Sequence, residues 1–299
     1  MKVLLTGASG FIGSHILIGL IKAFGKESVV ILTSKEIPDV NCIIYKSHTD
    51  FGLSKDYFNN ITHIIHAGAF TPKNSESAND LELCFSNIEY LKELFSFKLI
   101  NLTRFINLST LDVYAFTTGV LSEKSTIKPI SLYGSSKLYC EDMVKVFSHK
   151  NDVDYINLRI GHVYGSGEEK YKKVLPISIQ RILEGKSVEL FGDGEELRSF
   201  IFIDDVVESI INAIKVSVSN IDINVVSGVS ISIKDLLFRL IEISGKSINL
   251  VRKESNHKKR DLVFNNSLLL QTLLKSETIL IDGLKSEYEY MKVKYENYI

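Results

Sequence analysis

The chain has 299 residues, of which 45% are hydrophobic and 24% charged, with a formal net charge of −1 at pH 7. This composition predicts a folded globular protein and gives no general attraction to nucleic acid or to membranes. No basic run with interleaved aromatic residues occurs, no apolar span reaches 18 residues, and Lys2 already belongs to the first predicted strand, which leaves no room for a signal peptide.

The three cysteines Cys42, Cys84 and Cys140 are scattered, and no Cys-x-x-Cys motif is present. An odd number at such spacing favours reduced thiols in a cytoplasmic enzyme over a disulfide framework. The pattern implies no metal site.

A strand, a glycine turn and a helix are predicted at the start of the chain. Met1–Leu5 is a short apolar run, Phe11–Phe24 has apolar residues at helical spacing, and Gly7, Gly10 and Gly13 lie between them. Glycines allow the backbone to approach a pyrophosphate closely, and the helix N-terminus offers it unpaired N–H groups. The Gly-x-x-Gly-x-x-Gly spacing differs from the Gly-x-Gly-x-x-Gly fingerprint. The unit predicts a dinucleotide site; the alternative is a plain turn.

The second predicted strand, Ser28–Thr33, indicates which dinucleotide would bind. An NAD site favours an acid at the end of this strand, where it accepts hydrogen bonds from the ribose 2′-hydroxyl. Here Thr33 is followed by Ser34 and Lys35, and a hydroxyl with an ammonium suits a 2′-phosphate. We therefore expect NADP(H) to be preferred. NAD(H) stays possible because Glu36 is near, and the alternative is a polar loop with a solvated lysine.

A third predicted strand, Thr62–Ala69, ends in small residues that leave room beside a cofactor. Further along, Tyr133 and Lys137 are four residues apart and share one face of a predicted helix. A neighbouring ammonium is expected to lower the tyrosine pKa, which would suit proton transfer at a carbonyl or alcohol oxygen. The alternative is a partly buried ring beside a solvated amine.

Strands and helices alternate up to about Leu158, which predicts a parallel sheet covered on both faces. Beyond it we expect a smaller lid with further elements, and the helices at 80–95 and 133–147 carry apolar stripes. The predicted division is a dinucleotide-binding domain at 1–160, to which segments near 198–226 return, and a substrate-binding domain at 161–197 and 227–299. The later elements are helices at 170–184, 236–243 and 267–274 and a strand at 188–191.

Taken in order, these motifs resemble the extended short-chain dehydrogenase/reductase family, and within it the nucleotide-sugar epimerase, dehydratase and reductase branch. The set comprises the glycine loop, His66-Ala67-Gly68-Ala69, Asn87, Ser109-Thr110 and Tyr133 with Lys137. The resemblance implies an α/β fold: a Rossmann-like doubly wound parallel sheet with a smaller C-terminal substrate-binding domain. It also implies a homodimer in which the helices at 80–95 and 133–147 pair across a two-fold axis.

The resemblance extends into the second half of the chain. Leu158–Gly165 is similar to the family segment where the active site opens, and Phe191–Gly194 with Arg198–Val206 is similar to its next landmark. The arginine of that landmark would contact a substrate diphosphate. Asp204 and Asp205 are better explained as helix N-caps than as catalytic acids.

The residue roles that the resemblance implies fall into three groups. Thr110, Tyr133 and Lys137 would be catalytic. The cofactor would contact Gly7, Ser9, Gly10, Phe11, Ile12, Gly13, Thr33, Ser34, Lys35, His66, Ala67, Gly68, Asn87, Leu108, Tyr133, Lys137, Ile160, Gly161 and Val163. The substrate would contact Thr110, His162, Lys173, Arg198 and Arg260.

Departures from the family pattern favour one activity. His162 stands where the epimerases usually carry Asn and is similar to the His of deoxysugar 4-ketoreductases of the CDP-abequose and CDP-paratose synthase type. Leu111-Asp112 follows Thr110, whereas 4,6-dehydratases have an Asp-Glu pair there. Enzymes of the GDP-fucose synthase type have a Cys at the position of Asp112. Water elimination and proton exchange at C3 and C5 are therefore disfavoured.

The sequence thus predicts an NADPH-dependent reductase of a 4-keto group on a nucleotide-linked deoxysugar, as used in deoxysugar and polysaccharide biosynthesis. Tyr133 would donate the proton. The first alternative is an NAD-dependent nucleotide-sugar 4-epimerase that uses the same residues twice. A reductase of small aromatic or steroid ketones is disfavoured by Gly192–Arg198, and a non-enzymatic dinucleotide sensor by the presence of both Tyr133 and Lys137.

Overall fold

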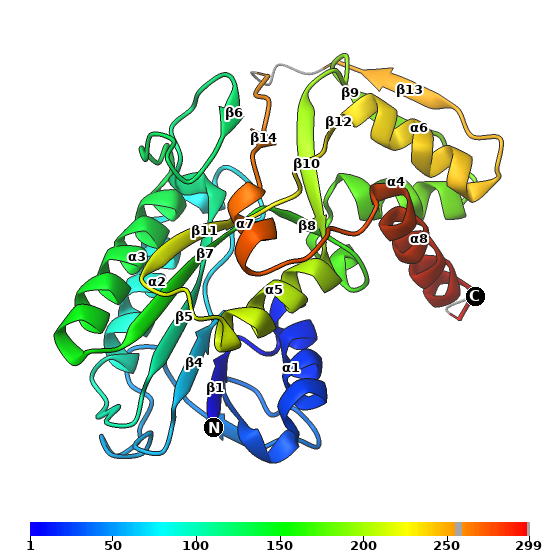
Figure 1. Cartoon of the computed structure of the whole chain (residues 1–299). Helices are drawn as coiled ribbons and strands as arrows, with labels where there is room; N and C mark the ends of the chain where they lie inside the picture. Colours follow the sequence, from blue (N-terminus) through cyan, green and yellow to red (C-terminus); the bar gives the residue numbers. More distant parts are fainter. Residues whose placement is uncertain (255–258, 298–299) are drawn as a thin grey trace.

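A seven-stranded parallel sheet forms the centre of the computed structural model, which describes residues 1–254 and 259–297 (Figure 1). Its strand order is β11-β7-β5-β4-β1-β2-β3. Most of its residues are apolar and buried, as expected for strands covered on both faces. The strands are β1 Val3–Thr6, β2 Val29–Thr33, β3 Cys42–Ile44, β4 His63–His66, β5 Arg104–Thr110, β7 Asp154–Ile160 and β11 Ile221–Val225.

Helices cover the two faces of this sheet in pairs. α1 (Phe11–Phe24) packs beside α5 (Ile203–Lys215) on one face, and α2 (Leu81–Leu94) packs beside α3 (Leu132–Asn151) on the other. β1 serves both faces, because Val3 and Leu5 belong to the first core and Leu4 to the second. The predicted Rossmann-like α/β fold is confirmed.

A smaller lobe lies beyond the carboxyl ends of the central strands (Figure 1). It contains a three-stranded sheet in the order β12-β10-β8 and a parallel pair, β13 with β9, while β14 pairs with β6. These strands are β6 Val120–Leu121, β8 His162–Tyr164, β9 Val188–Phe191, β10 Leu197–Phe202, β12 Ser230–Ser232, β13 Leu250–Lys253 and β14 Val263–Phe264. The helices are α4 Val174–Leu183, α6 Ile233–Ser244, α7 Ser267–Thr272 and α8 Leu280–Glu296. Short 3-10 helices are η1 Lys26–Ser28, η2 Ser77–Asn79, η3 Leu111–Val113 and η4 Glu168–Tyr171.

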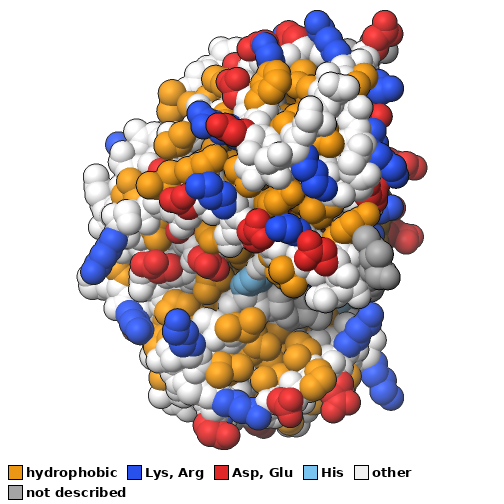
Figure 2. All heavy atoms as spheres, turned by 90° about the vertical axis from the view of Figure 1, so that its right-hand side faces the viewer, with side chains coloured by type: hydrophobic (Ala, Val, Ile, Leu, Met, Phe, Trp, Pro, Cys, Tyr) orange, Lys and Arg blue, Asp and Glu red, His pale blue; other side chains and the backbone are white. Residues whose placement is uncertain are grey.

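The face that carries α8 shows acidic and basic side chains close together among separate hydrophobic patches (Figure 2). No single sign of charge dominates it, in keeping with the near-neutral net charge of the chain. Within the two described ranges, every helix is too short or too polar to span a bilayer.

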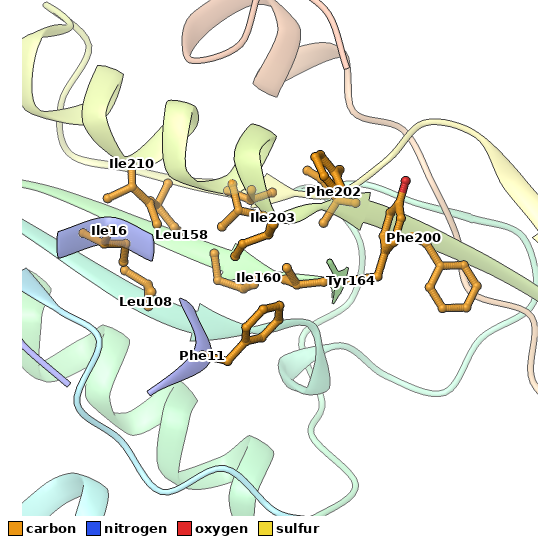
Figure 3. Packing of buried hydrophobic residues seen from close by; sticks show 14 of the residues in the cluster. Phe11, Ile16, Leu108, Leu158, Ile160, Tyr164, Phe200, Phe202, Ile203 and Ile210 are labelled. Carbon is orange, nitrogen blue, oxygen red and sulfur yellow. The ribbon is translucent and has the colours of Figure 1, made fainter. Parts of the chain in front are cut away.

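One continuous core joins the two parts of the molecule. Figure 3 shows Ile16 of α1 and Ile210 of α5 meeting over Leu108 and Leu158 of the sheet. The same cluster continues through Phe11 of α1 and Ile160 of β7 to the lobe residues Tyr164, Phe200 and Phe202. Because this core runs beneath the edge where the strands end, side chains from both parts are fixed relative to one another there.

Two local predictions are wrong. The predicted helix at 170–184 is divided into η4 and α4, because Lys172 adopts a left-handed conformation (φ 51°) between them. Asp204 and Asp205 do not cap α5: the N-cap is Phe202, and neither carboxylate makes a capping bond. Asp205 instead accepts hydrogen bonds from the Thr278 amide and hydroxyl, at 2.8 and 2.7 Å, and so ties α5 to the segment before α8.

Candidate active site

The glycine loop between β1 and α1 requires glycine at positions 7 and 13. Gly7 has φ +74°, and a Cβ there would collide with the Ala67 carbonyl of the neighbouring strand. A Cβ on Gly13 would collide with the carbonyl of Gly7, which also accepts a 3.0 Å hydrogen bond from the Gly10 amide. The turn is therefore tight enough to expose the N-terminus of α1, whose free N–H groups suit a pyrophosphate.

Two cavities meet at this loop, and another joins one of them from the lobe. The catalytic cavity, of about 400 Å³, runs from the glycine loop to Tyr133 and Lys137. The substrate cavity, of about 430 Å³, extends from it into the lobe, and a third of about 280 Å³ lies on the other side of the loop beside Tyr45 and His48. The residues common to the catalytic and substrate cavities are Lys73, His162, Val163, Tyr171 and Lys173.

Most of the predicted cofactor residues line these cavities. The catalytic cavity is lined by Gly7, Gly10, Phe11, Ile12, Gly13, Ala67, Leu108, Thr110, Tyr133, Lys137, Ile160, Gly161 and Val163. The third cavity is lined by Gly7, Ser9, Gly10, Ala67, Gly68 and Asn87. A long ligand with a diphosphate near the helix N-terminus could occupy both, and the donor set fits a nicotinamide dinucleotide.

Thr110, Tyr133 and Lys137 come together because β5 ends beside the first turns of α3. Ser131 caps α3 by accepting a 3.1 Å hydrogen bond from the Gly134 amide. The Tyr133 phenol, buried in the cavity wall, is hydrogen-bonded to Thr110 and also to Thr71. The three side chains therefore line one cavity, with Thr110 in contact with Tyr133.

The expected lowering of the Tyr133 pKa is wrong for the protein without ligands. Burial raises the pKa of the phenol, and the nearby Asp112 carboxylate raises it further, while the hydrogen bonds from Thr110 and Thr71 only partly oppose this. The Tyr133 phenol is consequently neutral near pH 7. Burial also lowers the pKa of the Lys137 ammonium, against the opposing effect of Cys140 and Glu141.

A polar network lies behind Lys137, one turn further along α3. The fully buried Glu141 accepts a 2.6 Å hydrogen bond from Ser109 and forms a two-pronged pair with Arg159, at 3.0 and 2.8 Å. Arg159 also donates to Tyr114. The Ser109 hydroxyl is thus engaged by Glu141, while its neighbour Thr110 contacts Tyr133.

Two predicted cofactor positions have structural roles beneath the loop. His66 is buried, shares a 3.0 Å hydrogen bond with Thr6, and has its pKa lowered to about 3 by burial, so it is neutral. It does not line the three cavities. Asn87 accepts a 2.7 Å hydrogen bond from the Phe70 amide and donates to Ser136 of α3 at 3.2 Å. It thereby connects the loop after β4 to the helix that carries Tyr133.

The residues after β2 present few side-chain donors. Thr33 is buried, and its hydroxyl donates to the Lys35 carbonyl at 2.9 Å. Ser34 and Lys35 are exposed, and these three residues lie outside the lining of the three cavities. Three residues were predicted to bind a 2′-phosphate. Of these, Ser34 and Lys35 have side chains that a ligand can reach, whereas Thr33 does not.

His162 lies at the junction of the two larger cavities. Its pKa is lowered to about 4, first by burial and then by the cations Arg198, Lys173 and Arg260, so the ring is neutral near pH 7. Nδ1 has no hydrogen-bond partner among the described residues. A neutral ring with an unused nitrogen at this position can hydrogen-bond a bound polar ligand.

The three predicted substrate cations occupy different places. Lys173 lines both larger cavities and Arg198 lines the substrate cavity, where it pairs with Glu196 at 2.9 Å. Arg198 also donates to the backbone carbonyl of Arg260. The Arg260 guanidinium instead lies over the Phe116 ring, 5.1 Å from its centroid, outside the lining of both cavities.

Sequence reasoning did not identify several residues of the site. Thr71 reaches Tyr133, and Lys73 and Tyr171 line the junction of the cavities. Thr71 and Lys73 directly follow the small residues after β4, which was the available signal. Tyr171 packs against Phe11 at 6.2 Å between ring centroids, a contact across 160 positions that no local pattern indicates.

Comparison with known proteins gives the family. A model described as the NAD dependent epimerase/dehydratase family matches residues 3–225. The chain belongs to this family. The chain is therefore an enzyme of the NAD-dependent oxidoreductase type, and its glycine loop lies at the same cavity as Thr110, Tyr133 and Lys137.

Curated relatives carry sugar-nucleotide names. The chain is 25% identical to an uncharacterised UDP-glucose epimerase, YtcB, of Bacillus subtilis, over 99% of both chains. It is 27% identical to a dTDP-D-glucose 4,6-dehydratase of Dictyostelium discoideum over 81% of this chain, but that match spans only 62% of the relative.

Solved structures agree along the whole chain. A UDP-glucose 4-epimerase of Thermotoga maritima with UDP-glucose is 25% identical, with a TM-score of 0.84 over 99% of this chain and 100% of that one. A UDP-glucuronic acid 4-epimerase of Bacillus cereus, in complex with UDP-glucuronic acid and NAD, is 26% identical, with a TM-score of 0.82 and the same coverage.

Proposed function

We propose that the protein is an NAD-dependent 4-epimerase of a UDP-linked sugar. The observation that carries this proposal is the full-length similarity to UDP-sugar 4-epimerases, which include one bound to NAD, together with Thr110, Tyr133 and Lys137 at one cavity. These residues are the ones needed both to oxidise a sugar alcohol and to reduce the resulting ketone.

A bound NAD would accept the hydride of the sugar C4 and return it to the opposite face. The chain handles the proton. In the oxidative half, Tyr133 as phenolate would take the proton of the 4-hydroxyl and become a neutral phenol. In the reductive half, it would give that proton back to the sugar oxygen, so that Tyr133 ends as the phenolate with which it began. Thr110, which hydrogen-bonds Tyr133, shares the sugar oxygen.

Burial of Tyr133 sets a requirement for the oxidative half. Its raised pKa disfavours the phenolate that must accept the proton. The Lys137 ammonium and the positive charge of the oxidised cofactor both favour phenolate. Proton abstraction is therefore expected only when the cofactor is bound in its oxidised form, whereas a neutral phenol is ready to donate without it.

A second candidate is the NADPH-dependent 4-ketoreductase predicted from the sequence. The observation that favours it is the absence of a carboxylate at the end of β2, where Ser34 and Lys35 are exposed instead. His162 is compatible with either activity, because its side chain lines both the catalytic and the substrate cavity.

The test is to purify the protein without added nucleotide, identify what it retains, and assay interconversion of UDP-glucose and UDP-galactose, and of the corresponding uronic acids. Retained NAD(H) and turnover without added cofactor would support the epimerase. Strict dependence on added NADPH and a 4-keto sugar would replace it with the ketoreductase.

We also propose that the protein forms a homodimer through α2 and α3. These helices lie side by side and carry exposed apolar residues on continuous stripes. Leu81 and Phe85 are one turn apart on α2, and Leu132, Tyr139 and Val146 follow at seven-residue spacing on α3. Pairing of the two stripes with their symmetry mates would remove them from water.

A further inference from the structure

Two buried carboxyl groups from distant parts of the chain face each other beneath the substrate cavity. Glu168 belongs to η4 and is 2% exposed; Glu287 belongs to α8 and is 1% exposed. Oε2 of Glu168 and both oxygens of Glu287 have no donor among the described residues. If one of the two carboxyls carries a proton, it can donate a hydrogen bond to the other. If neither carries a proton, two negative charges are buried next to each other, which is unfavourable.

Glu168 also touches the cation at the junction of the cavities. Its Oε1 lies 3.0 Å from the Nζ of Lys173, which lines both the catalytic and the substrate cavity. The ammonium is 5.7 Å from the centroid of the Tyr171 ring. Glu287, Glu168 and Lys173 therefore form a chain of contacts that leads from α8 to the cavity.

The loop between β8 and α4 that carries this chain is held from two sides. On the α1 side, His15 Nε2 is 2.8 Å from the Ser166 carbonyl. On the α8 side, Lys294 pairs with Glu169 at 2.6 Å. Glu169 and Lys173 are the charged groups that act on the carboxyl pair. Around them, Lys294 pairs with Glu169, His15 contacts the Ser166 carbonyl, and Tyr164 lies near Glu287 and Asp282 of α8.

We propose that Glu168 and Glu287 share one proton and thereby position Lys173 to bind the diphosphate of the nucleotide-sugar substrate. The proposal rests on the proposed function. With one proton, the pair carries a single negative charge that matches the ammonium. When the proton is lost, a second negative charge draws Lys173 toward α8 and also repels the phosphates. Both effects weaken binding of the nucleotide diphosphate.

The direction of the pH dependence follows from burial. Burial raises the pKa of Glu287 to about 9, with a further contribution from Glu168, whose own pKa is also raised by burial. The proton is therefore kept at neutral pH and lost above about pH 9. The pKa of Glu287 in the folded state exceeds the usual 4.5. Its contribution to the free energy of unfolding is therefore fully present below about pH 4.5 and decreases as the pH rises from there toward 9.

Calorimetric titration with UDP, from neutral pH to about pH 10, tests the proposal. We expect the dissociation constant of the unmodified protein to rise in the alkaline range, and Lys173→Met to weaken binding roughly 10- to 100-fold at neutral pH, as for loss of a charged hydrogen bond. Glu287→Gln should abolish the alkaline rise, because its amide donates to Glu168 at every pH. Glu168→Gln should weaken binding throughout.

Glu289→Gln is the matched control, since Glu289 is a solvent-exposed carboxylate on the same helix. Comparing variants at one pH cancels the ionisation of UDP itself. An alkaline rise of equal size in the unmodified protein and in Glu287→Gln would overturn the inference. Failure of UDP to bind the unmodified protein at any pH would instead contradict the proposed function.

Infrared spectroscopy gives a readout independent of the ligand. The unmodified protein should show a protonated-carboxyl C=O band at neutral pH that Glu287→Gln lacks and that disappears above about pH 9. Presence of the same band in Glu287→Gln would show that Glu287 does not hold the proton.

Discussion

Thr33 and Lys35 close a turn on one another: the Thr33 hydroxyl donates to the Lys35 carbonyl and accepts from the Lys35 amide at 3.2 Å. This turn withdraws Thr33 from any 2′-phosphate and leaves Lys35 as the exposed cation after β2. We therefore expect the ammonium of Lys35, beside the Ser34 hydroxyl, to be the only positive charge at this end of β2 available to a 2′-phosphate among the described residues 33–36.

For cofactor choice, we expect the unmodified protein to bind NADH at least as tightly as NADPH. Lys35→Ala should weaken NADPH alone, by roughly two- to fivefold, because exposed charge pairs contribute under about 1 kcal/mol. Thr33→Asp should weaken NADPH further through repulsion of the 2′-phosphate. Fluorescence titration of both reduced cofactors measures this. Tighter NADPH binding by the unmodified protein would support the ketoreductase instead.

For the chemical step, Tyr133→Phe removes the proton donor while keeping the ring. Turnover should fall by roughly 10²–10⁴-fold with cofactor affinity preserved, and Lys137→Met should reduce both. Tyr57→Phe, at an exposed position outside the lining of the three cavities, is the control. Near-normal turnover of Tyr133→Phe would remove this residue from the mechanism.

For stability, the pair of Glu141 and Arg159 behind Lys137 should be sensitive to loss of one partner. Glu141→Leu leaves a buried guanidinium partly unpaired and should lower the free energy of unfolding by about 3–5 kcal/mol. The double variant with Arg159→Met should recover much of that loss. Urea denaturation of four proteins measures this: the unmodified protein, Glu141→Leu, Arg159→Met and the double variant. Purely additive losses would argue against the pair acting as a unit.

For assembly, light scattering at micromolar concentration should give a mass near twice 33.7 kDa. Phe85 is 50% exposed and Val146 is 68% exposed, so Phe85→Glu with Val146→Glu should produce a monomer. Ile18→Glu, at an exposed site on α1, should leave the mass unchanged. An unmodified protein that is fully active as a monomer would exclude the dimer.

The part of the candidate site that is formed by residues close together in the sequence could be predicted. Gly7, Gly13, Tyr133 and Lys137 belong to a strand-turn-helix unit and to one helical turn, so short spacings determine where they lie. The apolar helix Phe11–Phe24 was predicted with its observed bounds for the same reason.

Other features depend on contacts that sequence spacing does not encode. Glu287 meets Glu168 across more than a hundred residues, and Asp205 meets Thr278 rather than capping its own helix. The left-handed Lys172 interrupts a segment whose residues favour a helix. The raised pKa of Tyr133 likewise follows from burial, which outweighs the cation that the helical spacing had suggested.

The position of β11 has a consequence for how the chain is made. β11 pairs with β7, which would otherwise be the last strand of the sheet on that side. A nascent chain that has emerged only as far as β7 exposes the unpaired backbone of a long buried strand, and such open edges readily pair with other chains. Sixty more residues must be synthesised before Ile221–Val225 can cover it. During that interval, protection of β7 from neighbouring polypeptides falls to chaperones or to the speed of translation.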